Sequence, residues 1–304
     1  MEFLRPESLG EALAARAAHP EAVPLAGGTD VMVELNFARR RPAALLDLTR
    51  VGELTGWHAD GGTVRVGAGV TYAELTGERA SGGQTALGRL LPGLAMAART
   101  VGSPQIRNRG TIGGNLGSAS PAGDCHPVLL ASGASVEAAS VRGRRQVPID
   151  DFFTGVKRNA LAPDELITAV LVPAPGGPEQ FAKIGTRNAM VIAVAAFAIV
   201  LDPVRRRVGT GIGSAAPTPV RAVAAERLLA GALAGDGLWE SRGPLPEQVV
   251  TEFGQAVSAA ASPIDDGRGT AGYRKQALAV LASRTLGWAW RDYRDSGQQA
   301  GRGC

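Results

Sequence analysis

The sequence predicts a two-domain α+β protein, and three observations lead to that prediction. The chain has 304 residues, about twice the length of a common domain. Short apolar runs typical of strands are interspersed with longer stretches of helical spacing. A Pro- and Gly-rich segment at 173–178 predicts a linker between two such mixed regions. We therefore expect one domain at residues 1–175 and a smaller one at 179–293.

The first domain is expected to open with a capped helix. Ser8 and Glu11 have the spacing of a capping box, and an alanine-rich stretch follows them to Ala18. Thr71 and Glu74 repeat that spacing before another helix. Periodicity further predicts helices at 31–35, 87–100 (broken at 92–93) and 124–132, and strands at 23–26, 45–48, 63–66, 134–139 and 166–172. Between 101 and 123 there is almost no periodicity, so we expect a long irregular segment of the kind that usually carries function.

The second domain is expected to hold a small antiparallel sheet with helices on one face. Its predicted strands are 181–184, 191–201 and 208–214, and its predicted helices are 220–233, 247–260 and 271–293. Residues 294–304 are polar and glycine-rich, so we expect a disordered tail. The longest apolar run, 189–201, is too short to span a bilayer and suits a buried strand.

Two glycine-rich turns, residues 25–30 and 111–115, organise the first domain. Adjacent glycines let the backbone approach a pyrophosphate closely, and the free amides of a helix start favour negative charge. Thr29 is a candidate N-cap and hydroxyl donor, whereas Asp30 is expected to cap the helix rather than touch phosphate. The donors expected in the second turn are the Thr111 hydroxyl, the unobstructed Gly113 and Gly114 amides and the Asn115 side chain. Neither turn matches the fingerprint of a nicotinamide Rossmann domain or of a P-loop.

Composition excludes several classes of protein. The formal charge is 32 − 28 = +4 with scattered basic residues, and aromatics make up 5%, so no nucleic-acid surface is expected. The run Arg39-Arg40-Arg41 is expected to complement a helix dipole and face solvent. Two cysteines cannot hold an iron–sulfur cluster, and the three histidines are isolated, so we expect no metal site in this chain. The N-terminus lacks the pattern of a signal peptide, and the expected location is the cytoplasm.

Several segments, taken in order, resemble the FAD-binding subunit of molybdenum hydroxylases, the family of xanthine dehydrogenase and carbon monoxide dehydrogenase medium subunits. These segments are residues 24–32, 102–115, 118–124, 183–190 and 265–268. The resemblance covers nearly the whole chain, and its order and spacing make it specific. It implies a two-part FAD-binding domain of the vanillyl-alcohol oxidase-like (PCMH) type, followed by the family's C-terminal domain with a three-stranded antiparallel sheet and helices.

The resemblance implies a noncovalent FAD and a role in electron transfer within a larger complex. In the family, a large subunit holds the molybdenum cofactor, a small subunit holds two [2Fe–2S] clusters, and the flavin subunit passes electrons to NAD+ or oxygen. This chain resembles only the last component, so we expect both partner subunits, assembled as a dimer of heterotrimers. Residues 183–190 and 151–153 resemble the xanthine dehydrogenase branch more closely than the carbon monoxide branch.

The resemblance also implies which residues contact FAD, and it implies no catalytic residue. The expected contacts are Leu25, Ala26, Gly27, Gly28, Thr29, Asp30, Val31, Met32, Val101, Thr111, Gly113, Gly114, Asn115, Ser118, Asp124, Ile167 and Lys183. Asp124 is expected to hold ribityl or ribose hydroxyls, or to cap a helix that begins at Cys125. Lys183 would stabilise the negative charge of the reduced flavin, unless it only ends a strand in water. Arg107 and Arg109 could contact the pyrophosphate or a partner subunit, and the sequence does not decide between these roles.

Three other functions remain open on the sequence alone. A stand-alone flavin oxidase often links its flavin covalently through His or Cys, and neither glycine-rich turn contains such a residue. A scaffold subunit with a vestigial flavin site would be colourless when purified. A carbon monoxide dehydrogenase medium subunit would share fold and cofactor, so only its large partner would distinguish it. Cys125 beside His126 invites a nucleophile interpretation, but the family offers no such role.

Overall fold

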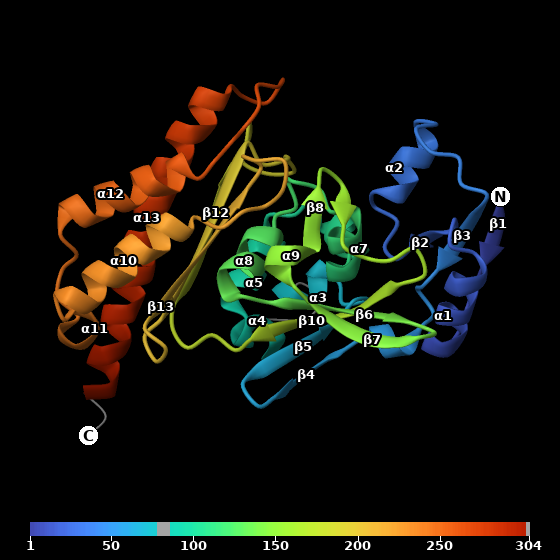
Figure 1. Cartoon of the computed structure of the whole chain (residues 1–304), viewed down its shortest axis with the longest axis horizontal. Coiled ribbons are helices and arrows are strands. Elements are labelled where there is room, and N and C mark those ends of the chain that lie inside the picture. The colour runs from blue at the N-terminus through green and yellow to red at the C-terminus, as the bar shows by residue number, and fades with distance from the viewer. Residues whose placement is uncertain (78–85, 302–304) are drawn as a thin grey trace. The chain divides into compact units, whose positions relative to one another are not determined.

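The computed structural model describes residues 1–77 and 86–301 (Figure 1). The chain forms two compact units whose segments alternate along the sequence. The first unit comprises residues 1–90, 101–120 and 134–174, and the second comprises 91–100, 121–133 and the chain from 175 onward. Two stretches of the N-terminal half, 91–100 and 121–133, therefore fold with the C-terminal half.

The first unit opens with a small parallel sheet in the order β1-β3-β2, with strands at Glu2–Leu4, Ala44–Asp47 and Val23–Leu25. Helix α1 (Leu9–Ala18) packs beside it through Leu9 and Ala12, which share a buried cluster with Leu46. The predicted cap of this helix is confirmed, because the Ser8 side chain accepts a hydrogen bond from the Glu11 amide. A short 3₁₀ helix, η1, spans Gly52–Leu54.

A five-stranded antiparallel sheet forms the rest of the first unit's framework. Its order is β4-β5-β10-β6-β7, with strands at Trp57–Asp60, Thr63–Gly67, Leu166–Pro173, Ser135–Ser140 and Gly143–Pro148. The surrounding elements are α3 (Tyr72–Thr76), α4 (Ala86–Leu90), α9 (Ile149–Phe152), β8 (Phe153–Gly155) and β9 (Arg158–Asn159). The capping box predicted at Thr71 and Glu74 is present at the start of α3.

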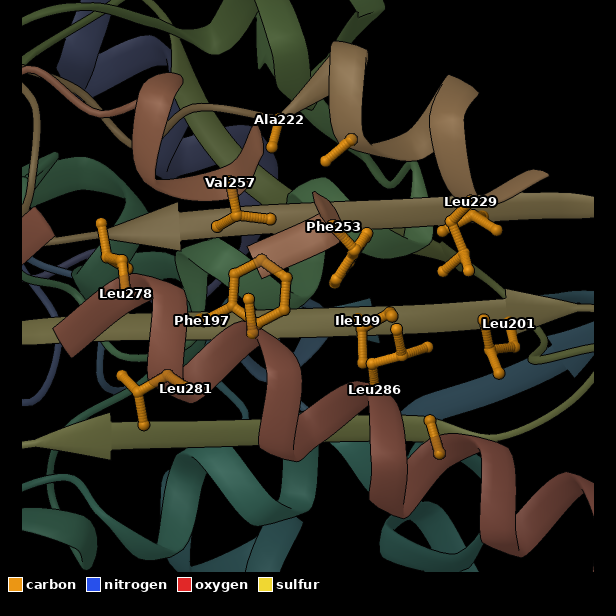
Figure 2. Packing of buried hydrophobic residues seen from close by; sticks show 14 of the residues in the cluster. Phe197, Ile199, Leu201, Ala222, Leu229, Phe253, Val257, Leu278, Leu281 and Leu286 are labelled. Atoms are coloured by element: carbon orange, nitrogen blue, oxygen red, sulfur yellow. The ribbon is translucent and has the colours of Figure 1, made fainter. Parts of the chain in front are cut away.

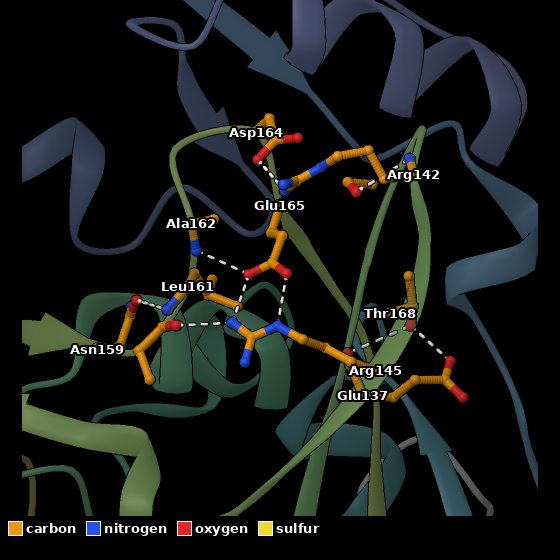
Figure 3. A network of polar contacts seen from close by, with 11 residues as sticks. Glu137, Arg142, Arg145, Asn159, Leu161, Ala162, Asp164, Glu165 and Thr168 are labelled. Atoms are coloured by element: carbon orange, nitrogen blue, oxygen red, sulfur yellow. Dashed lines mark hydrogen bonds and ion pairs between the residues drawn. The ribbon is translucent and has the colours of Figure 1, made fainter.

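Ionic contacts fasten the edge of this sheet to the loop before β10 (Figure 3). Arg145 on β7 donates two hydrogen bonds to Glu165, from Nε to Oε1 at 2.6 Å and from Nη2 to Oε2 at 2.7 Å. The Ala162 amide also donates to Glu165 Oε2, at 2.7 Å. Because these donors favour the ionised carboxylate, the pKa of Glu165 lies below its ordinary value, with the Arg145 hydrogen bond as the main cause.

The segment predicted to be irregular, 101–123, contains two short helices, α6 (Pro104–Arg107) and α7 (Ile112–Ser118). Each has a side-chain N-cap, since Ser103 accepts from the Ile106 amide and Thr111 accepts from the Gly114 amide. The sequence of α7 shows no helical periodicity because its glycines have low helix propensity. Packing overrides that propensity: a Cβ atom at Gly113 would lie 2.6 Å from the Ala68 Cβ, so the helix can approach Ala68 only with glycine there.

The second unit is built on the predicted three-stranded antiparallel sheet, which is confirmed. Its order is β11-β12-β13, with strands at Glu179–Ile184, Ala195–Asp202 and Arg207–Gly213. Phe197, Ile199 and Leu201 alternate along β12 and join one buried cluster with residues of three helices (Figure 2). These helices are α10 (Val223–Gly235), α12 (Glu247–Ala259) and α13 (Ala271–Gly301), and the short α11 (Leu238–Ser241) follows α10.

The sheet of the second unit carries helices on both faces, so the predicted single helical face is wrong. Helix α8 (His126–Ser132) packs on β12 and β13, and α5 (Pro92–Arg99) packs on β11. The contact is backbone to backbone: a Cβ atom at Gly209 would lie 2.0 Å from the Ala131 oxygen, and one at Gly211 would lie 1.9 Å from the Pro127 oxygen. Alternate glycines on β13 thus make room for α8 on one face only.

Helix α13 continues past the predicted end at Tyr293 to Gly301. The helix thus continues into the segment 294–304 that was expected to be a disordered tail, and residues 302–304 lie outside the described part of the chain. The physical reason is that adding a residue to an existing helix is much easier than starting one, so α13 continues past Tyr293 although Asp295 and Gly297 are poor helix formers. Over the ranges 1–77 and 86–301, no helix is both long and apolar enough to cross a membrane.

Candidate functional site

The first glycine-rich turn connects the end of β2 at Leu25 to α2 (Val31–Asn36), as predicted. A Cβ atom at Gly27 would lie 1.7 Å from the Arg109 carbonyl oxygen, so this turn rests directly on the 109–110 peptide. Gly28 has φ +77°, in the left-handed region that residues with a side chain rarely adopt. Both glycines are therefore required by the backbone itself.

The structure brings the two glycine-rich segments together within the first unit. A Cβ atom at Gly114, in the first turn of α7, would lie 3.9 Å from the Ala26 Cβ. The second segment is held in place by the start of α3 and the loop before that helix, because the Tyr72 amide donates to the Gly110 oxygen and the Ile112 amide donates to the Val70 oxygen, both at 3.0 Å. The second segment is the start of a helix rather than a turn.

The two segments differ in the hydrogen bonds that they can offer. Among the described residues, the backbone amides of Gly27, Gly28 and Thr29 have no acceptor. The Gly113 amide, in contrast, donates to the Ala68 oxygen, and the Gly114 amide donates to Thr111 Oγ1, both at 2.9 Å. The expectation that Gly113 and Gly114 offer unobstructed amides is therefore wrong, because α7 uses both in its own packing and capping. The residues that can receive an anion through free amides are those of the first turn.

Thr29 and Asp30 do not cap α2 with their side chains. The helix begins one residue later than a Thr29 cap requires, and Asp30 occupies the N-cap position with helical φ and ψ and no side-chain hydrogen bond. An N-cap side chain normally reaches its amide from an extended backbone, which explains why Asp30 makes no such bond. The Thr29 hydroxyl therefore remains available beside the free amides.

The other expected contacts of the first unit lie on α7, β10 and α2 and in the segment before α6. Ser118 donates to the Asn115 carbonyl oxygen at 2.9 Å, and a Cβ atom at Gly117 would lie 4.0 Å from Ile167 Cδ1 on β10. Val101 is half-buried, and its carbonyl accepts a hydrogen bond from Arg107 Nη1 at 3.0 Å. Met32 on α2 is 47% exposed. The Arg107 side chain thus holds its own segment, while Arg109 supplies the carbonyl under Gly27.

Asp124 and Lys183 belong to the second unit, where they form a buried ion pair. Lys183 Nζ donates to Asp124 Oδ2 at 2.7 Å, and the two side chains are 10% and 9% exposed. Burial raises the pKa of Asp124, and the charge of Lys183 only partly offsets this. The alternative that Lys183 ends a strand in water is wrong. Asp124 does not cap α8 either, because Cys125 occupies the N-cap position of that helix.

Two further residues of the second unit, Thr100 and Glu179, were not predicted from the sequence. Thr100 donates from Oγ1 to Asp124 Oδ2 at 3.2 Å, and its carbonyl oxygen accepts from Lys183 Nζ at 2.8 Å. Glu179 is buried and accepts from the Gly93 amide at 2.8 Å. These partners lie far apart in the sequence, so no local pattern signals them. Cys125 is fully buried, and burial raises the pKa of its thiol, which removes the nucleophile interpretation.

The fold and the free-amide turn define a protein that can hold a diphosphate against its backbone, as a dinucleotide requires. Residues 1–175 match the FAD binding domain in molybdopterin dehydrogenase, and residues 180–289 match the CO dehydrogenase flavoprotein C-terminal domain. The chain belongs to the family of FAD-binding medium subunits of molybdenum hydroxylases. It is an oxidoreductase subunit whose cofactor is FAD.

Relatives of different substrate classes resemble the chain to a similar degree. The nicotine 6-hydroxylase medium subunit of Paenarthrobacter nicotinovorans is 32% identical over 94% of this chain and 96% of its own length. The xanthine dehydrogenase FAD-binding subunit of Escherichia coli O157:H7 is 29% identical over 93% and 94%. A chain of the carbon monoxide dehydrogenase structure from Hydrogenophaga pseudoflava superposes with a TM-score of 0.85 at 30% identity, covering 96% and 98%.

Proposed function

We propose that this chain is the electron-transfer subunit of a molybdenum hydroxylase complex, resembling xanthine dehydrogenase. It would take electrons from the [2Fe–2S] clusters of a small subunit and pass them to NAD+ or oxygen, beside a large subunit that holds the molybdenum cofactor. When bound, FAD would supply the conversion between single electrons and a hydride. The complex would be a cytoplasmic dimer of heterotrimers. The family matches at 1–175 and 180–289 support residues 1–175 and 179–293 as the two domains.

The observation that carries the FAD placement is the set of free amides at Gly27, Gly28 and Thr29. A pyrophosphate there would receive backbone hydrogen bonds, and the absence of side chains at Gly27 and Gly28 allows it to approach closely. The cofactor would be noncovalent. The remaining contacts would come from the expected residues, namely Leu25, Ala26, Asp30, Val31, Met32, Val101, Thr111, Gly113, Gly114, Asn115, Ser118, Asp124, Ile167 and Lys183.

The roles of Asp124 and Lys183 would be linked. Lys183 Nζ donates to three oxygens, those of Thr100, Asp124 and Val191. An ammonium group has three protons, so Lys183 would act on the flavin through its charge and through the position of Asp124 rather than by a direct hydrogen bond. We expect Lys183→Ala to lower the flavin potential more than it weakens FAD binding, and spectroelectrochemical titration measures this. An unchanged potential would rule out that role.

The test of FAD placement uses two matched glycine variants. A Cβ atom at Gly114 would lie 3.0 Å from Thr111 Oγ1, a tight contact that requires a small shift, and 3.9 Å from the Ala26 Cβ. The Gly114→Val side chain would therefore stand beside the first turn, so the chain should fold and lose most of its FAD. Gly10→Val places the same side chain in the first turn of α1, where nothing lies within 4 Å, and should keep its FAD. FAD released by acid is measured by absorption and chromatography. A folded Gly114→Val chain with full FAD would contradict this placement, and colour retained in the acid pellet would indicate a covalent link.

A second candidate function is that of a carbon monoxide dehydrogenase medium subunit, favoured by the superposition with the Hydrogenophaga pseudoflava enzyme. The two candidates differ in the substrate of the large subunit. Anaerobic addition of xanthine or of carbon monoxide to the purified complex separates them, because only the true substrate should bleach the flavin absorption. Adding NAD+ or oxygen afterwards identifies the acceptor that restores the colour.

A further inference from the structure

One face of strand β11 holds helix α5 at both of its ends. Residues four positions apart on a strand point to the same face, so Glu179 and Lys183 project from one side of β11. At the start of α5, Glu179 Oε2 accepts a hydrogen bond from the Gly93 amide at 2.8 Å. At the end of the helix, Lys183 Nζ donates to the carbonyl oxygen of the C-cap residue, Thr100, at 2.8 Å. Both hydrogen bonds lie within the second unit.

The chemistry of these two residues matches the electrostatics of the helix. A helix has partial positive charge at its start, where backbone amides lack partners, and partial negative charge at its end. Leu91 occupies the N-cap position of α5 and has no polar side chain, so the Glu179 carboxyl supplies the missing acceptor from β11. A Cβ atom at Gly93 would lie 2.9 Å from Glu179 Oε2 and 3.0 Å from its Cβ, so a side chain there would disturb the contact. Glu179 is 5% exposed, which shields this cap from water.

Thr100, at the end of α5, contacts both members of the buried ion pair. Its carbonyl oxygen accepts from Lys183, and its Oγ1 lies 3.2 Å from Asp124 Oδ2. An eight-residue helix is about 12 Å long and four residues of a strand span about 13 Å, so β11 can meet both ends of α5 without bending. Because a helix moves as a rigid element, a shift at its start also moves Thr100 relative to Lys183.

We propose that Glu179 is a positioning residue for the Lys183–Asp124 ion pair, to which α5 links it. Its effect on the flavin rests on the proposed function. The three donors of the Lys183 ammonium group already have acceptors, so Glu179 acts through the helix rather than by direct contact. A buried ion pair stabilises only when its geometry is good. The cap at the start of α5 should therefore affect how well Lys183 stabilises the reduced flavin.

The flavin potential of the full FAD-loaded chain tests this role. At pH 6 a pKa of about 7 keeps Glu179 mainly protonated, so an uncharged replacement leaves the charge of the site nearly unchanged. Glu179→Met removes the acceptor and should lower the potential, by less than Lys183→Ala does. Glu179→Gln keeps an acceptor for the Gly93 amide and should have the wild-type potential. In a chain that already carries Lys183→Ala, Glu179→Met should have no further effect. Glu179→Leu makes the same test if the Met side chain prevents folding.

The matched control is Glu226→Met. Glu226 is another buried glutamate of the second unit that accepts from a backbone amide, that of Thr210, at 2.9 Å. It lies on α10 rather than at an end of α5. Its replacement should lower the urea unfolding midpoint and leave the flavin potential unchanged. A role of Glu179 in stability alone would give the same pattern for Glu179→Met.

Urea unfolding of the same chains without FAD gives a measurement that does not depend on the flavin. Substitutions about 13 Å apart along a strand usually have independent effects when they share no contact. If α5 links Glu179 to Lys183, the effects on the unfolding equilibrium constant should not multiply. We expect the Glu179→Met, Lys183→Ala double variant to differ from the product of the single effects by about threefold or more.

Four outcomes would overturn the proposal. They are an unchanged or raised potential in folded Glu179→Met, a lowered potential in Glu179→Gln, an equal shift in Glu226→Met, and single effects that multiply exactly in the unfolding of the double variant. Failure of the proposed function is distinct. It appears as a wild-type chain that binds no FAD, or as a Lys183→Ala chain with the wild-type potential, while the coupling in urea unfolding can still be measured.

Discussion

Lys183 Nζ lies 2.7 Å from Asp124 Oδ2, and both side chains are about nine-tenths buried. The two other donors of the ammonium group reach the carbonyl oxygens of Thr100 at 2.8 Å and Val191 at 3.2 Å. One lysine therefore joins β11, the end of α5, the segment before α8 and the loop before β12. Removing a single member of a buried pair leaves an uncompensated charge, whereas removing both can cost little.

We expect Lys183→Met to lower the free energy of unfolding by about 3 kcal/mol, because it strands the Asp124 carboxylate in a buried site. Adding Asp124→Asn should recover most of this loss, since no buried charge then remains. Urea unfolding at pH 7 measures both. The control is Lys157→Met, whose exposed pair with Glu34 should contribute less than about 1 kcal/mol. Strictly additive losses in the double variant would mean that the pair is not coupled.

Glu179 should make the stability of the second unit depend on pH. Burial raises the pKa of this carboxyl from 4.5 to about 7, and the Gly93 hydrogen bond offsets only part of the effect. The folded chain therefore holds the proton more tightly than the unfolded chain does. The stabilising contribution is fully present below about pH 4.5 and is lost as the pH rises through about 7, by about 3 kcal/mol in total.

Replacing the Glu179 carboxyl tests whether the stability of the second unit falls as the pH rises. Glu179→Gln cannot ionise and keeps an acceptor for the Gly93 amide, so it should match the wild type near pH 4.5 and be more stable at pH 8. Glu165→Gln should behave oppositely. Arg145 holds the pKa of Glu165 below its ordinary value, so that stabilisation is present at neutral pH and is lost as the pH falls through the folded pKa. Urea unfolding at pH 4.5 and pH 8 tests Glu179→Gln, whereas the effect of Glu165→Gln should appear mainly below about pH 4.5. Equal pH slopes for Glu179→Gln and wild type would contradict the burial argument.

The backbone contact between β13 and α8 predicts a large cost for a single methyl group. Gly211→Ala should lower the free energy of unfolding by about 3 kcal/mol, because its Cβ would lie 1.9 Å from the Pro127 oxygen and neither backbone can yield easily. Gly231→Ala, in α10, has nothing within 4 Å and should instead raise it by up to about 1 kcal/mol. If Gly211→Ala lowered the free energy of unfolding by no more than an ordinary surface substitution does, the close backbone contact between α8 and β13 would be contradicted.

The sequence predicted those features whose cause is local. Ser8 and Thr71 occupy the cap positions expected from residues three places ahead, and the three strands of the second unit follow from their apolar runs. It failed where a helix depends on tertiary packing, as at Gly113 of α7, whose contact residue Ala68 is distant in the chain. Even for α7, the sequence contains a threonine at the N-cap position, Thr111, which is a residue type that often begins a helix.

The candidate site also has a part that the local sequence predicts and a part that depends on residues distant in the chain. Adjacent glycines at 27 and 28 identify a place where a backbone can meet a phosphate, and a local pattern is sufficient to find it. Which amides stay free is decided by distant partners, because the Ala68 carbonyl takes the Gly113 amide while none takes that of Gly27 among the described residues. The link between Glu179 and Gly93 joins residues 86 positions apart, beyond the reach of any sequence window.

The position of α8 against β13 also has a consequence for synthesis on the ribosome. All seven residues of α8 are buried in the finished protein, yet the strand that covers them ends at Gly213, which is 213 − 132 = 81 residues after the helix ends. At about 5–20 residues per second, translation needs roughly 4–16 s to cover that distance. For those seconds the nascent chain presents an apolar helix without its sheet, exposed apolar surface of the kind that makes chaperones necessary.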